Sequence, residues 1–260
     1  MNRIDAKFAE LRSAGNKGVI AYVTAGDPDL ETTEELVCRL AESGAAMVEL
    51  GVPFSDPVAD GPVIQAAACR ALENGVTLED VLELASRLRS RLDIPLLVMT
   101  YYNPVYSFGL ESFIDSASTS GLDGVIVPDL PLEESEEFSK MLQQSGLHLI
   151  HLLAPTSSPG RIKATVKKAG GFIYCVSVSG VTGARNGLPA SGYELLSRVR
   201  SETDLPLALG FGISRPEQVS ALGDDADAVI IGSAIVRLVE EGGNREEILE
   251  RVSSYLKKFS

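Results

Sequence analysis

One unit recurs along this chain: an apolar run, a loop rich in glycine and proline, and an amphipathic stretch of helical spacing. The runs are continuously apolar rather than alternating, as is typical of parallel strands buried on both faces. They cover residues 18–24, 45–48, 95–101, 124–127, 148–153, 172–176, 205–209 and 228–231. About eight units in 260 residues predict an α/β fold, a (β/α)₈ TIM barrel formed as a single domain over residues 1–260. A doubly wound parallel sheet uses the same unit and is the alternative.

Helix starts are marked at several places. Ile4, Phe8 and Leu11 recur at helical spacing ahead of the first run, which predicts an extra N-terminal helix over one end of the core. Later helices are predicted from a capping residue followed three positions later by an acid. Each such pair predicts a helix that begins directly after the capping residue. The pairs are Thr77 and Asp80, Ser191 and Glu194, Ser214 and Glu217, and Asn244 and Glu247.

The charge balance narrows the classes of partner. The net charge of −13 argues against nucleic acid or an anionic membrane surface as a partner. No apolar run approaches the ~18 residues that a membrane span needs, and the first residues lack the apolar core of a signal peptide. The three cysteines are an odd number without close spacing, which argues against a disulfide framework or a zinc site. We therefore expect a cytoplasmic protein.

Glu49 is the most conspicuous candidate for chemistry. It follows the second apolar run and precedes a loop broken by glycines and prolines, so we expect it at the end of a strand. Because side chains alternate along a strand, Met47, Glu49 and Gly51 share one face. An acid on an apolar strand is costly to bury unless it has partners or a raised pKa, a cost that active sites accept.

Two further acids lie on the loop after Glu49. Asp60 could form an acid/base pair with Glu49 if their environments push the two pKa values apart. A turn-forming aspartate that accepts backbone N–H bonds is an equally good interpretation of Asp60. Asp56, between Ser55 and Pro57, is its competitor and could be a plain turn residue.

Glycine-rich loops follow the last three predicted strands, at residues 179–183, 210–214 and 232–234. A glycine-rich loop after strand seven and a short helix opening after strand eight form the usual phosphate site of a barrel. The predicted helix start at Ser233 offers unpaired N–H groups and a favourable dipole. The loop from Gly210 lacks the third glycine of a dinucleotide fingerprint, so we do not infer NAD.

The absence of certain residues from the predicted strand ends argues against several mechanisms. No lysine falls at the carboxyl end of a predicted strand, which makes a Schiff base unlikely as the mechanism. His148 and His151, the two histidines, should lie on opposite faces of one strand and so cannot jointly bind a metal. Carboxylates and backbone donors remain, and tyrosines 22, 101, 102 and 174 with Phe211 could line an aromatic pocket.

At these residues the chain resembles the tryptophan synthase alpha-chain family. The resemblance rests on motifs in family order from the first strand to the last. The motifs are Thr24-Ala-Gly-Asp-Pro28, Glu49-Leu-Gly-Val-Pro-Phe-Ser-Asp-Pro57, Ala59-Asp-Gly-Pro62, Ser179-Gly-Val-Thr-Gly183, Gly210-Phe-Gly-Ile-Ser214 and Gly232-Ser-Ala-Ile-Val236. The resemblance implies retro-aldol cleavage of indole-3-glycerol phosphate to indole and glyceraldehyde 3-phosphate.

The resemblance also implies residue roles. Glu49 matches the general acid/base that moves protons between the glycerol hydroxyl and indole C3, and Asp60 matches the carboxylate at the indole N–H. Thr182 matches the residue of a closing loop. The phosphate positions match Gly183, Gly212, Gly232 and Ser233, and the indole pocket matches Tyr22, Ile64, Tyr101, Tyr174 and Phe211.

By the same resemblance, this chain needs no cofactor or metal of its own. The partner is a beta chain that carries PLP and joins the alpha chain in an alpha2-beta2 tetramer. The face that meets it matches Pro53, Asp56, Asn103, Asp129 and Pro131.

Two other functions remain open. One is a catalytically weak barrel that acts mainly as an allosteric activator of the beta chain. The other is a different phosphate-handling barrel, such as an isomerase, which would need a base elsewhere. The intact Glu49, Asp60 and Gly183 favour the lyase.

Overall fold

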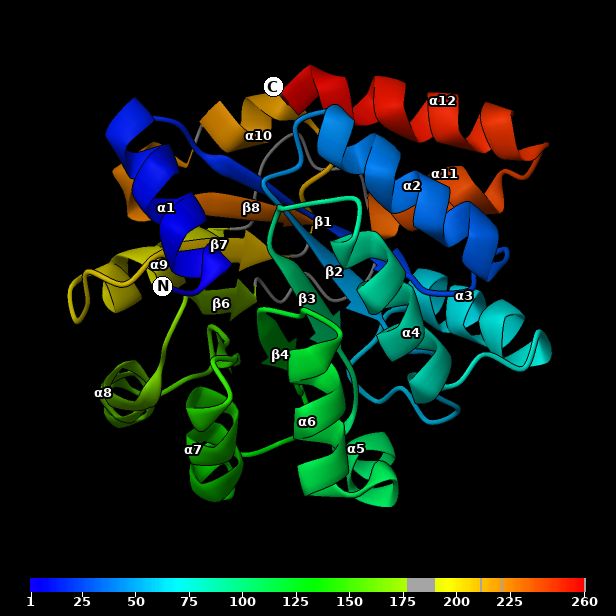
Figure 1. The fold of residues 1–260 in the computed structure, drawn as a ribbon. Coiled ribbons are helices and arrows are strands. Elements are labelled where there is room, and N and C mark those ends of the chain that lie inside the picture. Colours follow the sequence, from blue (N-terminus) through cyan, green and yellow to red (C-terminus); the bar gives the residue numbers. More distant parts are fainter. Residues whose placement is uncertain (177–189, 211, 221, 260) are drawn as a thin grey trace.

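The structure, a computed structural model, describes residues 1–176, 190–210, 212–220 and 222–259. Its centre is a closed barrel of parallel strands that pair in sequence order, with β1 hydrogen-bonded to β8 (Figure 1). This closure confirms the barrel and rules out the doubly wound sheet, whose edge strands stay unpaired. The strands are β1 (Gly18–Thr24), β2 (Met47–Gly51), β3 (Leu96–Met99), β4 (Gly124–Ile126), β5 (His148–Leu153), β6 (Ile173–Val176), β7 (Leu207–Gly210) and β8 (Ala228–Ile231).

Helices surround the barrel on the outside (Figure 1). They are α1 (Arg3–Ala14), α2 (Leu30–Glu42), α3 (Pro62–Glu73), α4 (Leu78–Arg89), α5 (Tyr102–Phe108), α6 (Leu110–Thr119), α7 (Glu136–Gln144), α8 (Pro159–Lys168), α9 (Ala190–Arg200), α10 (Pro216–Ser220), α11 (Ser233–Glu240) and α12 (Arg245–Leu256). Short 3₁₀ turns cover Gly223–Asp225 and Lys257–Phe259.

The strands are buried on both faces, and each face belongs to a different apolar cluster. On β2, Val48 and Leu50 join the large cluster between the barrel and its helices, whereas Met47 joins the cluster inside the barrel. The alternation predicted for β2 is therefore confirmed, and Glu49, next to Val48 and Leu50 in sequence, lies on the inner face with Met47.

Helix α1 closes the end of the barrel at which the strands begin (Figure 1). Ile4 and Phe8 are fully buried in the inner cluster, and the Phe8 ring lies 5.6 Å from the ring of Phe172. The predicted N-terminal helix and its position are therefore confirmed. The site must lie at the other end of the barrel, where the strands finish.

A buried aspartate and a partly buried one tie α1 to the strand starts. Asp123 accepts hydrogen bonds from Arg3 of α1, from Arg89 and from the N–H of Leu96 at the start of β3. Asp227 repeats this arrangement across the barrel. It accepts from Arg12 of α1, from Arg200 and from the N–H of Leu207 at the start of β7. These charge-assisted bonds stabilise the end of the barrel away from the site.

The predicted helix starts have mixed outcomes. Complete capping boxes are present at Thr77 with Asp80 and at Asn244 with Glu247. Ser191 is not a cap, because it lies inside α9, which already includes Ala190.

At α10 the predicted pair is shifted by one residue. The side chain of Gln218, not Glu217, accepts the N–H groups of Ser214 and Arg215. Gln218 is the third residue of the helix, and a glutamine there can satisfy the capping N–H as well as an acid can.

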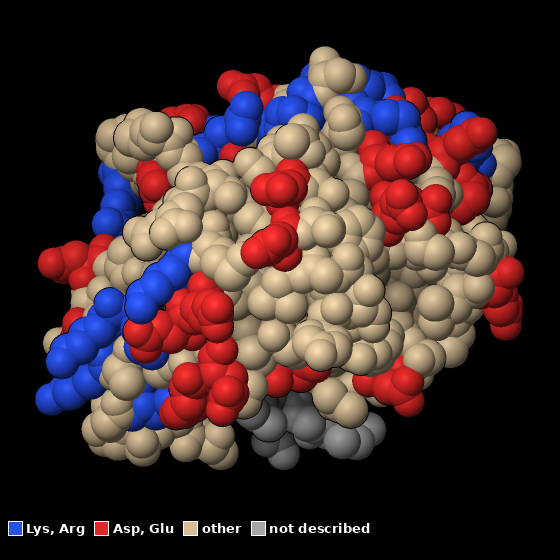
Figure 2. Space-filling model, turned by 60° about the horizontal axis from the view of Figure 1, so that its bottom comes forward, with Lys and Arg blue, Asp and Glu red and all other residues tan. Residues whose placement is uncertain are grey.

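Charge is unevenly spread over the surface. On the face shown in Figure 2, acidic side chains are dispersed, while lysines and arginines gather toward the left and the top. Within the described residues, no helix combines the length and the apolar character needed to cross a membrane.

Candidate active site

Glu49 occupies an enclosed position inside the barrel. Its side chain has no exposed surface, and neither carboxyl oxygen has a hydrogen-bond partner among the described residues. Burial raises the pKa of the Glu49 carboxyl to about 8. A buried polar group without a partner normally costs stability, so this carboxyl group is a strong candidate for proton transfer.

Two tyrosines share the barrel interior with Glu49. Tyr22 of β1 lies directly opposite Glu49 in the strand register, and Tyr174 projects into the inner cluster from β6. Burial is the main cause of the raised pKa of both phenols, and the charges of Glu49 and Asp60 raise the two values further. The structure therefore brings both predicted carboxylates within electrostatic reach of both tyrosines.

Asp60 lies on the loop between β2 and α3. Burial raises the pKa of its carboxyl to about 6, although the nearby Tyr101 hydroxyl opposes part of the rise. The backbone of Asp60 closes a turn onto Pro57, with its N–H 3.1 Å from the Pro57 carbonyl oxygen. Asp60 thus closes a turn with its backbone N–H, whereas no backbone N–H of the described residues donates to its carboxyl group.

The other predicted pocket residues surround this region. Tyr101 is buried, packs its ring 5.3 Å from Phe54 and accepts the N–H of Ala59 at 3.0 Å. Ile64 of α3 packs in a small cluster with Tyr22. The loop that carries Asp60 is therefore held by Tyr101, one of the residues predicted to line the aromatic pocket.

Two glycines of this region pack against tyrosine rings, a role that the sequence did not indicate. A Cβ atom on Gly51 would lie 2.1 Å from the hydroxyl oxygen of Tyr22, and one on Gly210 would lie 2.4 Å from the ring of Tyr174. Both contacts are impossible for a side chain without movement of the tyrosine. A glycine that ends a strand is the available signal in the sequence, but it does not reveal which ring packs against it.

The predicted phosphate positions lie at the ends of neighbouring strands. Gly212 follows β7 in a left-handed conformation with φ of 80°, and its carbonyl oxygen accepts from the Gln218 side chain at 3.1 Å. Gly232 precedes α11 and no side chain caps that helix, so the N–H groups from Ser233 onward lack a side-chain acceptor. Gly183, Thr182 and Phe211 lie outside the described residues.

Three predicted interface residues meet on the outer surface. Asn103, Asp129 and Pro131 are exposed and line one hollow of about 510 Å³ together with Tyr106. Asp129 also accepts the first N–H of α5, from Tyr102, at 2.9 Å.

The other two interface candidates lie on the β2–α3 loop. Asp56 is exposed there and accepts the Ser55 hydroxyl at 2.6 Å. Pro53 is buried within the chain. It can support the loop but does not present a surface to a partner in this conformation.

An arginine clamp near the site was not found from the sequence. Arg70 of α3 donates two bonds of 2.8 Å to Asp27, a buried acid on the loop after β1. The same guanidinium donates to Glu240 of α11 at 3.2 Å. Arg70 therefore links the loop after β1 to α3 and α11, the helices that follow Asp60 and Gly232.

The two histidines lie apart, as predicted. His148 hydrogen-bonds to Asp5 of α1 at 3.1 Å, whereas His151 is buried among residues on the outside of the barrel wall. No group of three or more His, Cys, Asp or Glu side chains placed to hold a metal ion occurs in the described part of the chain.

Comparison with known proteins gives a consistent result. A family model described as tryptophan synthase alpha chain matches residues 8–260. A tryptophan synthase alpha chain from a Thermoanaerobacter species is 44% identical over 256 residues, which cover 98% of this chain and 97% of that protein.

Solved structures agree with this result. The tryptophan synthase alpha subunit of Legionella pneumophila superposes with a TM-score of 0.91 at 35% identity, covering 100% of this chain and 97% of that one. A chain from the Pyrococcus furiosus tryptophan synthase α2β2 complex superposes with a TM-score of 0.88 at 39% identity, covering 93% of this chain and 97% of that one.

Proposed function

The chain belongs to the tryptophan synthase alpha-chain family, and from this membership we propose which of its residues carry out the family's reaction. The reaction is the retro-aldol cleavage of indole-3-glycerol phosphate to indole and glyceraldehyde 3-phosphate, in tryptophan biosynthesis. One proton must be added to indole C3 and one removed from the hydroxyl of the neighbouring glycerol carbon. The net proton count is zero, so one group that first donates and then accepts can serve both steps.

Glu49 is the proposed group. The observation that carries this assignment is its buried carboxyl, which has no partner among the described residues and a pKa of about 8. At neutral pH this carboxyl is mostly protonated and can donate to C3. Protonation makes the ring an electron sink. The resulting carboxylate can then take the hydroxyl proton as the C–C bond breaks and its electron pair returns to the ring.

Asp60 has the complementary role. With a pKa of about 6, its carboxyl is mostly ionised at neutral pH, when Glu49 is mostly protonated. Protonation of C3 places positive charge on the indole nitrogen. A carboxylate near that N–H stabilises this charge in a region from which water is largely excluded. The separated pKa values thus support a division of labour between two similar side chains.

Binding of the substrate is assigned to neighbouring elements. Gly212, Gly232, Ser233 and Gly183 hold the phosphate through backbone N–H groups, which do not require a positively charged side chain. Tyr22, Ile64, Tyr101, Tyr174 and Phe211 enclose the indole ring, and Thr182 closes the site. Of these residues, Gly183, Phe211 and Thr182 rest on the family alone, because they lie outside the described residues.

The chain works with a partner. The structural relative from Pyrococcus furiosus belongs to an α2β2 tryptophan synthase complex that shows mutual activation. We propose the same alpha2-beta2 assembly here, with PLP in the beta chain, in the cytoplasm. The proposed contact face comprises Asp56, Asn103, Asp129 and Pro131, three of which line one exposed hollow, while the buried Pro53 supports the loop that carries Asp56.

Turnover of two variants tests the carboxylate roles. Glu49→Gln should lower kcat for indole release by about 10²–10⁴-fold, because the amide cannot transfer the proton. Asp60→Asn should also lower kcat. Indole release is measured with and without the beta chain, and exposed Asp56→Asn serves as the control for the loop in the assays without the beta chain.

Normal turnover in Glu49→Gln would refute the assignment of the acid/base. If the wild-type chain released no indole with or without the beta chain but still stimulated that chain, it would be an allosteric activator rather than a working lyase.

A further inference from the structure

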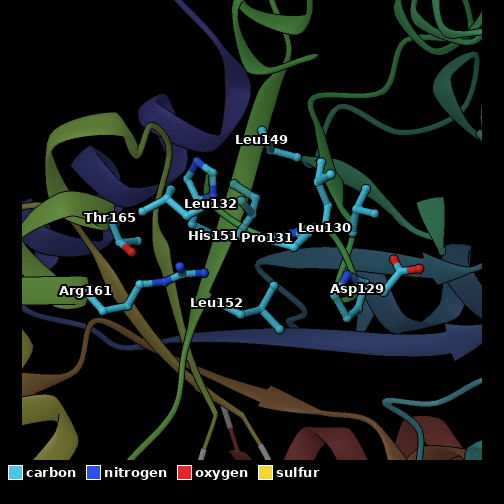
Figure 3. A pocket seen from close by; sticks show the side chains of 12 residues that line it. Asp129, Leu130, Pro131, Leu132, Leu149, His151, Leu152, Arg161 and Thr165 are labelled. Atoms are coloured by element: carbon cyan, nitrogen blue, oxygen red, sulfur yellow. The ribbon is translucent and has the colours of Figure 1, made fainter. Parts of the chain in front are cut away.

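A second pocket lies outside the barrel, apart from Glu49. Its walls are the loop after β4 (residues 127–132), the middle of β5 and one side of α8 (Figure 3). Its volume is about 250 Å³. Its lining residues are mainly aliphatic, including Leu132 and Leu149, but polar atoms form the larger part of the surface that faces the cavity. The proposed reaction uses none of the residues on β5 or α8.

One polar group of this pocket, the imidazole of His151, has a hydrogen-bonding position that is unused by the described residues. The His151 side chain is 7% exposed, and its Nε2 has no hydrogen-bond partner in the described ranges. Thr165 of α8, also buried, brings a hydroxyl to the same wall. A buried imidazole nitrogen normally has a partner, so one without a partner on the wall of a cavity indicates a missing hydrogen-bonding group.

Arg161 adds a positive charge. Its side chain extends from α8 into the middle of the residues that line the pocket, toward His151 and Leu152 (Figure 3). Glu133 at the rim accepts from Nη1 at 2.6 Å, and no hydrogen bond joins Nε or Nη2 to the described residues. One edge of the guanidinium therefore remains available for a second acceptor.

The acidic groups nearby do not fill the pocket. The Asp129 carboxylate points away from it in Figure 3 and accepts the N–H of Tyr102. Glu133 is exposed, and Glu136 of α7 pairs with Lys168 and Lys140 on the surface. Burial is the main reason that the pKa of His151 falls to about 4, and the positive charges of Lys168 and Arg161 lower it further. Lys168 and Arg161 are thus the charged groups that act on His151.

From these observations we infer that this pocket binds a small aliphatic carboxylate. The carboxylate would accept hydrogen bonds from Arg161 and from His151 or Thr165, and the aliphatic part would pack on Leu132 and Leu149. A cavity of about 250 Å³ suits a molecule with roughly eight non-hydrogen atoms. The free edge of Arg161 and the partnerless nitrogen of His151 favour a hydrogen-bonding anion, and the aliphatic side chains in the wall favour an alkyl acid over an inorganic ion.

The two histidines provide a direct test on the full-length chain. His148 and His151 give two imidazole signals in NMR spectra of histidine-labelled protein, and His148, bound to Asp5, is the internal reference. The probe is 4-methylpentanoate at pH 7 and constant ionic strength. We expect a saturable shift of the His151 signal at millimolar concentration or below, with His148 unchanged and 4-methylpentanamide without effect.

Paired α8 variants assign the binding to the pocket. Arg161→Gln should weaken binding at least about tenfold, because it removes the charge that selects a carboxylate. Lys163→Gln should leave binding unchanged, because Lys163 faces Glu202 at 3.6 Å instead of the pocket. The inference is overturned if the His151 signal does not shift saturably up to about 50 mM probe. Equal effects of the acid and the amide, or unchanged binding in Arg161→Gln, would overturn it as well.

Discussion

Glu49 connects the chemistry of this protein with its stability. Its pKa of about 8, compared with 4.5 for an unperturbed glutamate, means that the folded chain retains a proton that the unfolded chain loses as the pH rises. The contribution of Glu49 to the free energy of unfolding is therefore most favourable below pH ~4.5, and it falls as the pH rises from there to about 8. The decline amounts to several kcal/mol at most, at about 1.4 kcal/mol for each unit of pKa shift.

Replacing Glu49 by methionine should stabilise the fold increasingly as the pH rises. Methionine has a similar volume but neither a charge nor an unmet hydrogen bond. We expect the Tm of Glu49→Met to exceed that of the wild type by a few degrees at pH 5 and by about 5–10 °C at pH 8. Thermal unfolding measured at both pH values checks this expectation. Glu83→Met, at an exposed position on α4, is the control. A Tm gap that stays constant between pH 5 and 8 would contradict the raised pKa.

At the scale of elements, the site depends on two strands that end in glycine, which has no side chain. Gly51 ends β2 directly beneath the Tyr22 hydroxyl, and Gly210 ends β7 beneath Tyr174. The strands themselves were predictable, because continuous apolar runs bounded by glycine and proline are a local signal. The contacts of these two glycines were not predictable, since each requires a neighbouring strand to be in its final register.

Gly51→Ala should disturb the site more than the fold. The new Cβ would lie 2.1 Å from the Tyr22 hydroxyl oxygen, so the tyrosine must move away from its place opposite Glu49. We expect kcat/KM for indole release to fall by at least about tenfold and stability to fall by about 1–3 kcal/mol. Steady-state kinetics and chemical denaturation provide the measurements. Gly160→Ala is the matched control, because its Cβ would have no neighbour closer than 4.0 Å. Equal behaviour of the two variants would show that the Tyr22 position is unimportant.

At the scale of the whole molecule, the barrel separates stability from function. The two aspartate clamps and α1 hold the end where strands begin, whereas the carboxylates, the glycine-rich turns and the exposed hollow lie where strands end. A partner on the second end could contact the hollow without disturbing the clamps. The hollow lies on the loop after β4, and the pocket of His151 is lined by the same loop.

The proposed partner face can be tested with two asparagines. Asn103→Ala removes an exposed amide from the hollow and should raise the beta-chain concentration needed for half-maximal activation by about tenfold. Asn16→Ala removes an exposed amide beyond α1, at the opposite end of the barrel, and should have no effect. The measurement is indole release during titration with the beta chain. Similar titration curves for the two variants would place the contact face elsewhere.

The sequence by itself determined the barrel, the N-terminal helix, two of the four predicted capping boxes and the sharing of one face of β2 by Met47 and Glu49. These features follow from the strand and helix periods and from capping residues, all of which act over a few positions. Only the tertiary structure decided which groups meet Glu49 and which groups remain without partners. Asp27 and Arg70, 43 positions apart, form a clamp only when α3 packs against the loop after β1. The missing partner of His151 likewise appears only once α8 covers β5, because burial and pairing depend on contacts distant in sequence.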